Sequence, residues 1–409
     1  MHLATKTNGD IRVCCQANQG PNRGLLKDDH GNTLNLYYDN IEDTRNNSLL
    51  KDIRKSLIKG EKHSECKRCW DEESSGVNSR RKKYVEWWGN KDFYIENTAD
   101  DGSINESVKL LDYDLRFGNF CNLKCLTCGP SDSHTWYGDF EKLYGKFDTP
   151  STMSWPEKNE FWVDIEKQIP YMKNVIIMGG EPLLIEKHYD FLKKCIELGH
   201  AKDIVLEYFT NMTNVHKKAL DLWTHFKKVV VYCSIDAYGE LNDYIRFPSK
   251  WKIIERNIKI LDGSTDNIFP IVRTTVSVFN IYYLDELIKW RFNQNFKKVN
   301  DIYGMYPVIH SHPLHLPNNQ SIKIFPQKSK IIIANKLRLL YNWFDDIEIN
   351  NKEYVRKKLI DKIEGYINYM MSEDKSNLIP SFYQINNRLD EFRKNKLDEK
   401  TNDLLGGVA

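Results

Sequence analysis

The middle of the chain alternates short apolar stretches with longer stretches in which apolar residues recur at helical spacing. The short stretches are rich in Val, Ile and Tyr, which predicts β-strands; they cover 111–117, 174–178, 204–209, 228–235, 268–278 and 301–309. Between them, helical spacing covers 158–168, 187–198, 215–226, 251–261 and 284–292. This alternation predicts βα units, and hence an α/β fold whose parallel sheet is covered by helices. Six such units make a partial (β/α)6 TIM-like barrel.

The two flanking regions have different patterns. Residues 1–100 are polar and turn-rich and contain a first group of cysteines. Residues 105–310 form the predicted barrel. Residues 320–409 carry many charges and place apolar residues at helical spacing, as at Ile333, Leu337, Leu340 and Phe344. We therefore expect a small N-terminal domain, the barrel and a helical C-terminal region packed on it.

Charge and composition narrow the class of protein. The chain has 409 residues and a formal charge of +2, because 59 Lys and Arg face 57 Asp and Glu. Such a balance gives no reason to expect nucleic acid or a membrane surface as partner. The sequence also lacks an apolar run of membrane length and a signal-peptide pattern, so we expect a cytoplasmic protein. Thiols stay reduced there, and clustered cysteines are then interpreted as metal ligands.

The central cysteines have the spacing C-x3-C-x2-C. Cys121, Cys125 and Cys128 follow the first predicted barrel strand, and catalytic loops lie at that face of a barrel. Three thiolates this close can bind one [4Fe–4S] cluster and leave one iron without a protein ligand. The alternative is a structural zinc site, which usually takes four protein ligands.

Cys121, Cys125 and Cys128 in this spacing resemble the cluster motif of the radical S-adenosylmethionine (radical SAM) superfamily. The resemblance covers about residues 105–310 and implies a catalytic [4Fe–4S] cluster that cleaves S-adenosylmethionine reductively. The resulting 5′-deoxyadenosyl radical takes hydrogen from a substrate, for which we expect a peptide or protein, with a small molecule or a nucleotide-derived substrate as the alternative. It also implies an electron donor such as flavodoxin or ferredoxin. The motif departs from the family at Thr127, where an aromatic residue usually stands beside the adenine.

Later strand ends carry further residue types of this superfamily. Gly179, Gly180, Glu181 and Pro182 resemble its GGEP motif, whose backbone carbonyls receive the ammonium group of the cofactor. Glycine suits this role because it lacks a Cβ and lets the backbone come close. Asn211 ends the next strand in a pair that resembles the T-N of the family, placed to bond ribose hydroxyls.

The fourth and fifth strands supply three more candidates. Ser234 and Asp236 resemble the S-I-D-G sequence of the family. They are candidates either for ribose contacts or for capping the helix that follows. Arg273 lies in an otherwise apolar strand, where a charge needs a partner. The partner is either the methionine carboxylate of the cofactor or an internal acid.

The first cysteine group comprises Cys14, Cys15, Cys66 and Cys69, after an Asn-Gly hairpin signal. The region resembles the twitch and SPASM-type extensions of the superfamily, which implies an auxiliary [4Fe–4S] cluster. In those proteins the extension usually follows the barrel, whereas here it precedes it. Adjacent side chains on a strand point to opposite faces, so Cys14 is favoured over Cys15 as a ligand. A small zinc knuckle is the alternative.

Two functions thus follow from the sequence. The first is a radical SAM enzyme with an auxiliary cluster. The second is a non-catalytic interaction module that two zinc sites organise. A histidine group after the sixth predicted strand fits either substrate lining or a metal; it consists of His310, His312 and His315.

Overall fold

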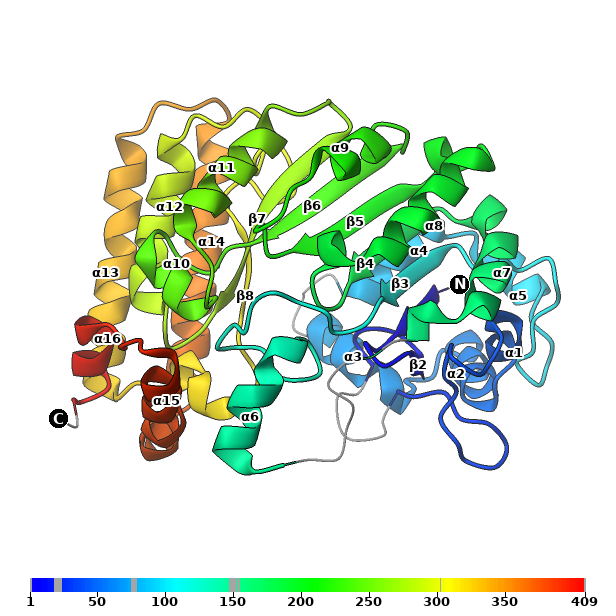
Figure 1. Cartoon of the computed structure of the whole chain (residues 1–409), viewed down its shortest axis with the longest axis horizontal. Helices are drawn as coiled ribbons and strands as arrows, with labels where there is room; N and C mark the ends of the chain where they lie inside the picture. The colour runs from blue at the N-terminus through cyan, green and yellow to red at the C-terminus, as the bar shows by residue number, and fades with distance from the viewer. Residues whose placement is uncertain are drawn as a thin grey trace. The chain divides into compact units, whose positions relative to one another are not determined.

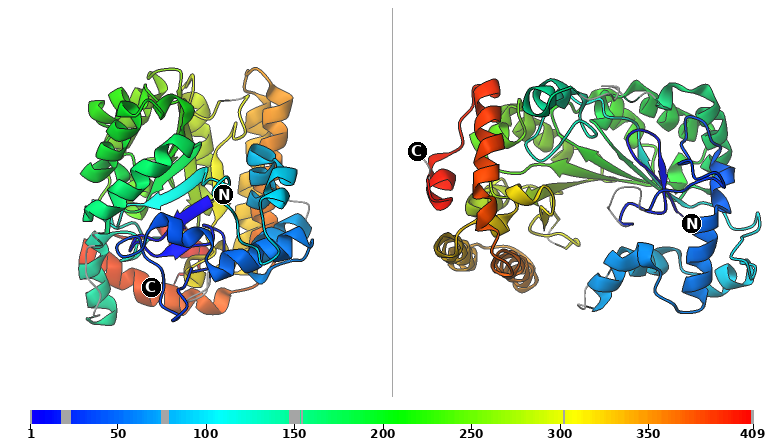
Figure 2. Two further views of the ribbon diagram at one scale, coloured as in Figure 1. Left: turned by 90° about the vertical axis from the view of Figure 1, so that its right-hand side faces the viewer. Right: turned by 90° about the horizontal axis from the view of Figure 1, so that it is seen from below.

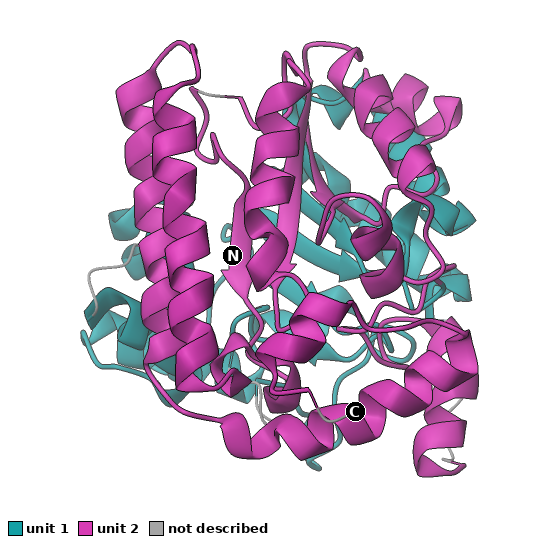
Figure 3. Cartoon of the chain, turned by 90° about the vertical axis from the view of Figure 1, so that its left-hand side faces the viewer, with its two compact units in different colours: residues 1–120, 152–208, 225–228 teal, residues 121–151, 209–224, 229–409 magenta. Residues whose placement is uncertain are grey.

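The computed structural model describes residues 2–17, 24–74, 79–146, 153, 155–301 and 303–407. The chain divides into two compact units (Figure 3). Unit 1 comprises Met1–Phe120, Thr152–Tyr208 and His225–Lys228, and unit 2 comprises Cys121–Ser151, Phe209–Thr224 and Val229–Ala409. Eight described strands, mostly parallel and with helices between them, confirm the predicted α/β class with an open sheet (Figure 1).

The strands of unit 1 follow the order β2-β1-β3-β4-β5. All neighbours are parallel except β1 and β2, which form an antiparallel hairpin. The predicted Asn-Gly turn is confirmed: the Lys6 amide donates to the Asp10 carbonyl at 2.8 Å, and Gly9 has a φ of 91°. The bounds are β1 His2–Thr5, β2 Ile11–Arg12, β3 Asp112–Arg116, β4 Asn174–Met178 and β5 Val205–Thr210.

The helices of unit 1 fall into a group before β3 and a group after it. Asn47, Ser79 and Asn90 cap helices of the first group through their side chains. In the second group, α7 and α8 bury one face each. The bounds are α1 Ile41–Arg45, α2 Ser48–Ile58, α3 Lys67–Ser74, α4 Arg80–Trp88, α5 Lys91–Glu96, α7 Asn159–Gln168 and α8 Glu186–Glu197.

The remaining strands, β6 Lys228–Ser234, β7 Ile268–Val276 and β8 His310–Pro313, pair in parallel. Burial alternates along β7, so one of its faces is buried and the other is partly exposed. The strand predicted at 301–309 is wrong in position, because Pro307 cannot donate to a ladder and the strand begins after it. Two helices of unit 2 precede these strands, α6 Tyr137–Tyr144 and α9 Lys217–Trp223. Between the strands lie α10 Glu240–Ile245, α11 Trp251–Asp262 and α12 Leu284–Asn293.

The C-terminal part of unit 2 is helical, as predicted. Its elements are α13 Gln327–Asp345, α14 Lys352–Met371, α15 Ile379–Arg393 and α16 Glu399–Leu404. Helices α13 and α14 lie side by side (Figure 2), and Arg338 pairs with Glu364 between them at 2.7 Å. The four apolar residues predicted to share one face of α13 are all buried. Within the described ranges, none of the helices has the length and apolar character needed to cross a bilayer.

Candidate active site

Cys121, Cys125 and Cys128 lie together in the loop that follows β3. Cys121 and Cys125 are buried, and Cys128 is half-buried. All three side chains pack with Leu123 in one small cluster. The structure therefore brings together the three thiols whose spacing predicts a shared cluster.

Side chains from distant segments hold the carbonyl groups of this loop. The indole of Trp136 donates to the Cys125 carbonyl at 2.9 Å. The amide of Gln320 donates to the Leu126 carbonyl at 3.1 Å. These bonds fix the backbone on both sides of Cys125, so the direction of its thiol is set by the fold.

The first thiol has its own polar partners. The Cys121 amide donates to Nδ1 of His134 at 3.1 Å, so that nitrogen carries no proton. The amide group of Asn211 lies 3.7 Å from the Cys121 sulfur and donates to Asn122 at 2.9 Å. The predicted strand-end residue Asn211 thus contacts the cysteine loop itself.

The charge around the loop favours a thiolate. A hydrogen bond from Cys128 is the largest influence on Cys125; it outweighs burial and lowers the pKa of Cys125 to about 7, with help from Arg246 and Arg393. The same hydrogen bond and burial raise the pKa of Cys128. The Nε of Arg246 and both Nη atoms of Arg393 are buried and have no hydrogen-bond partner within the described ranges. Thiolates with buried cationic donors nearby fit a [4Fe–4S] cluster, whose sulfurs accept hydrogen bonds.

The Gly179–Pro182 turn lies directly against the residues that precede Cys121. Gly180 has a φ of 53°, and a Cβ there would lie 2.3 Å from the Phe120 carbonyl oxygen. The amide of Glu181 donates to the same oxygen at 2.7 Å, and its side chain caps the turn that begins at Pro182. Glycine is required here because the chain packs on its own backbone.

Asp236 is bound on both sides by residues of its own unit. One carboxylate oxygen accepts from Arg246 at 2.7 Å, and the other accepts from the Thr275 amide at 2.8 Å. This arrangement gives Asp236 a structural role, as the partner of Arg246 and not as a helix cap, since Gly239 is the N-cap residue of α10.

Arg273 lies on the partly exposed face of β7, opposite Ser234 of β6 and His310 of β8. Its guanidinium lies over the Phe209 ring, 4.4 Å from the centroid. The Phe209 ring stacks on Tyr232 at 4.6 Å, and Tyr232 contacts His310 at 5.4 Å. Arg273, Ser234 and His310 therefore belong to one strip of cationic, polar and aromatic side chains.

Three of the four N-terminal cysteines are neighbours in unit 1. The pKa of Cys66 is raised to about 11, mainly by burial and then by the thiols of Cys14 and Cys69. The amide of Gln16 donates to the Cys14 sulfur at 3.3 Å, and the Cys69 sulfur lies 3.9 Å from the Gln16 side chain.

Cys15 faces a different environment. Burial raises its pKa to about 12, and the charges that act on it are those of Arg80 and Asp114 as well as the neighbouring Cys14. Cys14 and Cys15 both lie beyond β2, which ends at Arg12, so strand alternation does not separate them; their different surroundings do.

Several residues around the loop were not found from the sequence. Arg246 follows α10, and its type gave no signal by itself. Arg393 bonds Asp139 at 2.9 Å across 254 residues. Asp139 also bonds Lys124 at 2.9 Å, within the cysteine motif. Such long-range pairs leave no local pattern in the sequence.

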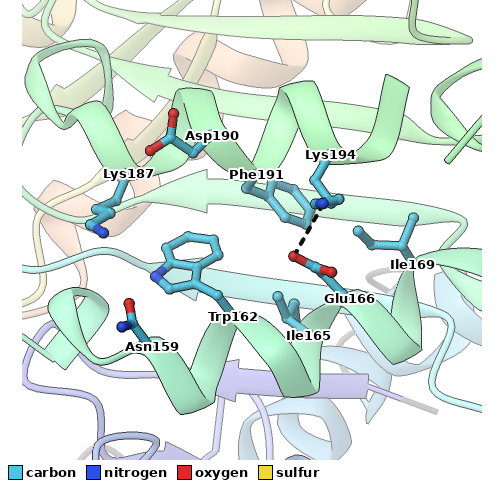
Figure 4. Close-up of a pocket in the computed structure, with 9 residues that line it drawn as sticks. All are labelled: Asn159, Trp162, Ile165, Glu166, Ile169, Lys187, Asp190, Phe191 and Lys194. Carbon is cyan, nitrogen blue, oxygen red and sulfur yellow. Dashed lines mark ion pairs between the residues drawn. The ribbon is translucent and has the colours of Figure 1, made fainter. Parts of the chain in front are cut away.

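A separate pocket of about 190 Å³ opens between α7 and α8 of unit 1 (Figure 4). Lys194 turns toward Glu166 across it, at 3.6 Å. None of the predicted site residues lines this pocket. In the part of the chain that the structure describes, no three or more His, Cys, Asp or Glu side chains are arranged to hold a metal ion, and this includes the packed thiols of the cysteine loop and those of the N-terminal group.

Comparisons with known proteins give one family match and structural neighbours. A model described as the Radical SAM superfamily matches residues 115–279. No curated protein matches the chain. Among solved structures, "Native anSMEcpe with bound AdoMet and Kp18Cys peptide" is 16% identical with a TM-score of 0.37, over 55% of this chain and 58% of that one. "Native anSMEcpe with bound AdoMet" is 17% identical with a TM-score of 0.36, over 55% and 59%. The chain thus spans less than two thirds of the length of either.

Proposed function

We propose, from the premise that this chain belongs to the radical SAM superfamily of enzymes, that Cys121, Cys125 and Cys128 bind its catalytic [4Fe–4S] cluster. The observation that carries the proposal is the packing of these three thiols into one cluster of side chains. When bound, the cluster supplies the electron that cleaves S-adenosylmethionine to a 5′-deoxyadenosyl radical. Three ligands leave one iron for the cofactor.

We further propose roles for the strand ends. The turn Gly179–Pro182 offers backbone carbonyls to the cofactor ammonium, while Asn211 and Ser234 offer polar groups to its ribose. Arg273 binds a carboxylate of cofactor or substrate, since its guanidinium lies on the partly exposed face of β7. Asp236 acts indirectly by orienting Arg246.

The decisive test is anaerobic purification followed by cluster analysis. Two cuboidal clusters require about eight irons per chain. Cys125→Ala should lose about half of that iron and all deoxyadenosine formation with dithionite. Cys195→Ala is the matched control, because Cys195 is a buried thiol in α8 apart from both cysteine groups. Colourless protein containing only zinc would instead support the interaction module.

We propose that Cys14, Cys66 and Cys69 bind the auxiliary [4Fe–4S] cluster. The support is that the Cys14 and Cys69 sulfurs both lie beside Gln16 and that both thiols act on the pKa of Cys66, whereas Cys15 is influenced by Cys14 alone among these thiols. Cys66→Ala should lose about four irons and keep the spectrum of the catalytic cluster. Cys15→Ala should keep all of its iron. Equal loss in both variants would contradict this ligand set, and zinc at this site would favour the knuckle.

For the substrate we propose a peptide or protein, which superfamily members with auxiliary clusters often modify. A flavodoxin or ferredoxin is the proposed electron donor. Co-expression with short peptides encoded beside the gene, followed by mass spectrometry, tests the substrate class. A mass change that depends on S-adenosylmethionine supports it. Turnover of a small molecule with no change in any such peptide contradicts it.

A further inference from the structure

Arg246 is held beside Cys125 by backbone hydrogen bonds. The Lys124 amide donates to the Phe247 carbonyl at 2.7 Å, and the Leu126 amide donates to the Ile245 carbonyl at 2.8 Å. These bonds join the loop on both sides of Cys125 to the C-terminal end of α10 on both sides of Arg246. The backbones of Cys125 and Arg246 are therefore neighbours, and the charge of Arg246 acts on the Cys125 thiol.

The guanidinium of Arg246 has a hydrogen-bond partner for one of its nitrogens, and among the described residues none for another. Its Nη1 bonds Asp236 at 2.7 Å. Its Nε is buried and has no hydrogen-bond partner among the described residues. A buried N–H without an acceptor is costly, so this site needs an additional acceptor. Cys125 and Cys128 are the thiols whose charge acts on Arg246.

A second arginine reaches the same loop from the C-terminal helix α15. Arg393 is buried and bonds Asp139 at 2.9 Å. Its guanidinium lies 4.6 Å from the Trp136 ring centroid and 5.5 Å from that of Phe247. Trp136 bonds the Cys125 carbonyl, and Phe247 belongs to the pairing with Lys124. Both Nη atoms of Arg393 are buried, and no residue that the structure describes accepts a hydrogen bond from them.

We propose that Arg246 and Arg393 are positioning residues that stabilise the reduced form of the catalytic cluster and thereby raise its reduction potential. The inference rests on the proposed function of the three cysteines. Reduction adds one negative charge at the loop, and a buried cation nearby favours that state because screening is weak in the interior. Hydrogen bonds to cluster sulfurs act in the same direction. The helix α15, far along the chain, is thus part of the electron-accepting site.

The test is a potentiometric titration of the anaerobic holoprotein, followed by electron paramagnetic resonance. The catalytic signal is the one that changes when S-adenosylmethionine is added. At the wild-type midpoint, Arg393→Gln and Arg246→Gln should each lower the ratio of reduced to oxidised cluster about tenfold, or ~59 mV for one electron. Arg393→Lys keeps the charge and should stay close to wild type.

Arg388→Gln is the matched control. Arg388 lies in the same helix, and among the described residues its side chain donates to the Leu143 carbonyl at 3.0 Å and to the Lys142 carbonyl, both in α6. Its potential should equal that of the wild type. If Arg393→Gln fails to load iron while Arg393→Lys loads it, the role of the charge is again supported.

Two results overturn the inference. One is an unchanged potential in loaded Arg393→Gln and Arg246→Gln. The other is loss of the cluster from both Arg393→Gln and Arg393→Lys, which indicates a merely structural role. A wild-type protein without any [4Fe–4S] signal would instead refute the proposed function, so the two failures are distinguishable.

Discussion

Asp139 pairs with two cationic side chains at the edge of the cysteine loop, and we expect its removal to lower the free energy of unfolding substantially. Its side chain is 5% exposed, and it bonds both Arg393 and Lys124 at 2.9 Å. The Arg393 side chain is 1% exposed, so in Asp139→Ala its charge stays buried without a counter-ion. Removing one member of a buried pair costs about 3–5 kcal/mol. Lys124 is 23% exposed and can turn toward water, which adds little to this cost.

Urea unfolding of the anaerobic protein, followed by circular dichroism, measures this change. A loss near 4 kcal/mol lowers the midpoint by at least about 1 M, because the urea dependence is about 1–3 kcal/mol per M. Asp345→Ala is the matched control, since the pair of Asp345 with Arg356 is solvent-exposed and contributes little. Arg393→Met added to Asp139→Ala should recover much of the loss, because it removes the unpaired charge.

A wild-type urea midpoint in Asp139→Ala, or a double variant no more stable than the single one, would show that Asp139 does not neutralise a buried charge. The acid dependence gives a second check. Burial acts to raise the pKa of Asp139, but hydrogen bonds from Lys124 and Arg393 outweigh it and lower the pKa. The contribution of Asp139 is therefore complete above about pH 4 and is lost as the pH falls further.

Two further predictions concern unit 1. Gly180→Ala should lower the melting temperature and the iron content, because the new Cβ would lie 2.3 Å from a backbone oxygen. Gly199→Ala is the control: Gly199 also has a positive φ, of 76°, but a Cβ there would meet no atom within 4 Å, so this variant should keep its iron. Burial opposes ionisation of Asp112, but pairing with His2 outweighs it and brings the pKa of Asp112 to about 2. Its stabilisation is complete above about pH 4 and fades toward pH 2, so Asp112→Asn should flatten the decline in the urea midpoint between these values; an equally steep decline contradicts it.

Much of the fold was predictable because its signals are local. The spacing of apolar residues predicted a strand with the observed bounds of β4, and a helix that differs from α11 by one residue. Strand β1 was missed because four residues are too few to establish alternation. Strand β8 was misplaced because the apolar residues before it include Pro307, which ends rather than extends a ladder.

The residues of the candidate site likewise fall into those with a local sequence signal and those without one. The three central thiols were predicted because their ligand spacing lies within eight residues of sequence. The role of Asp236 was ambiguous, since the same residue type serves as a cap, a ligand or an ion-pair partner. Only the structure shows that the carboxylate of Asp236 forms an ion pair with Arg246. No pattern within one segment could have paired Arg393 with Asp139.

The position of Cys121 depends on both kinds of residue. Its neighbour Phe120 is held by the Glu181 amide at 2.7 Å and by the missing Cβ of Gly180, and both belong to a motif readable in the sequence. On the other side, Cys125 is held through Trp136 and the pairing around Arg246, which no motif reveals. A chain with all three cysteines intact could thus still lose its cluster through a change in a distant helix. The cysteine spacing identifies the ligands, and the buried arginines determine how readily the site accepts an electron.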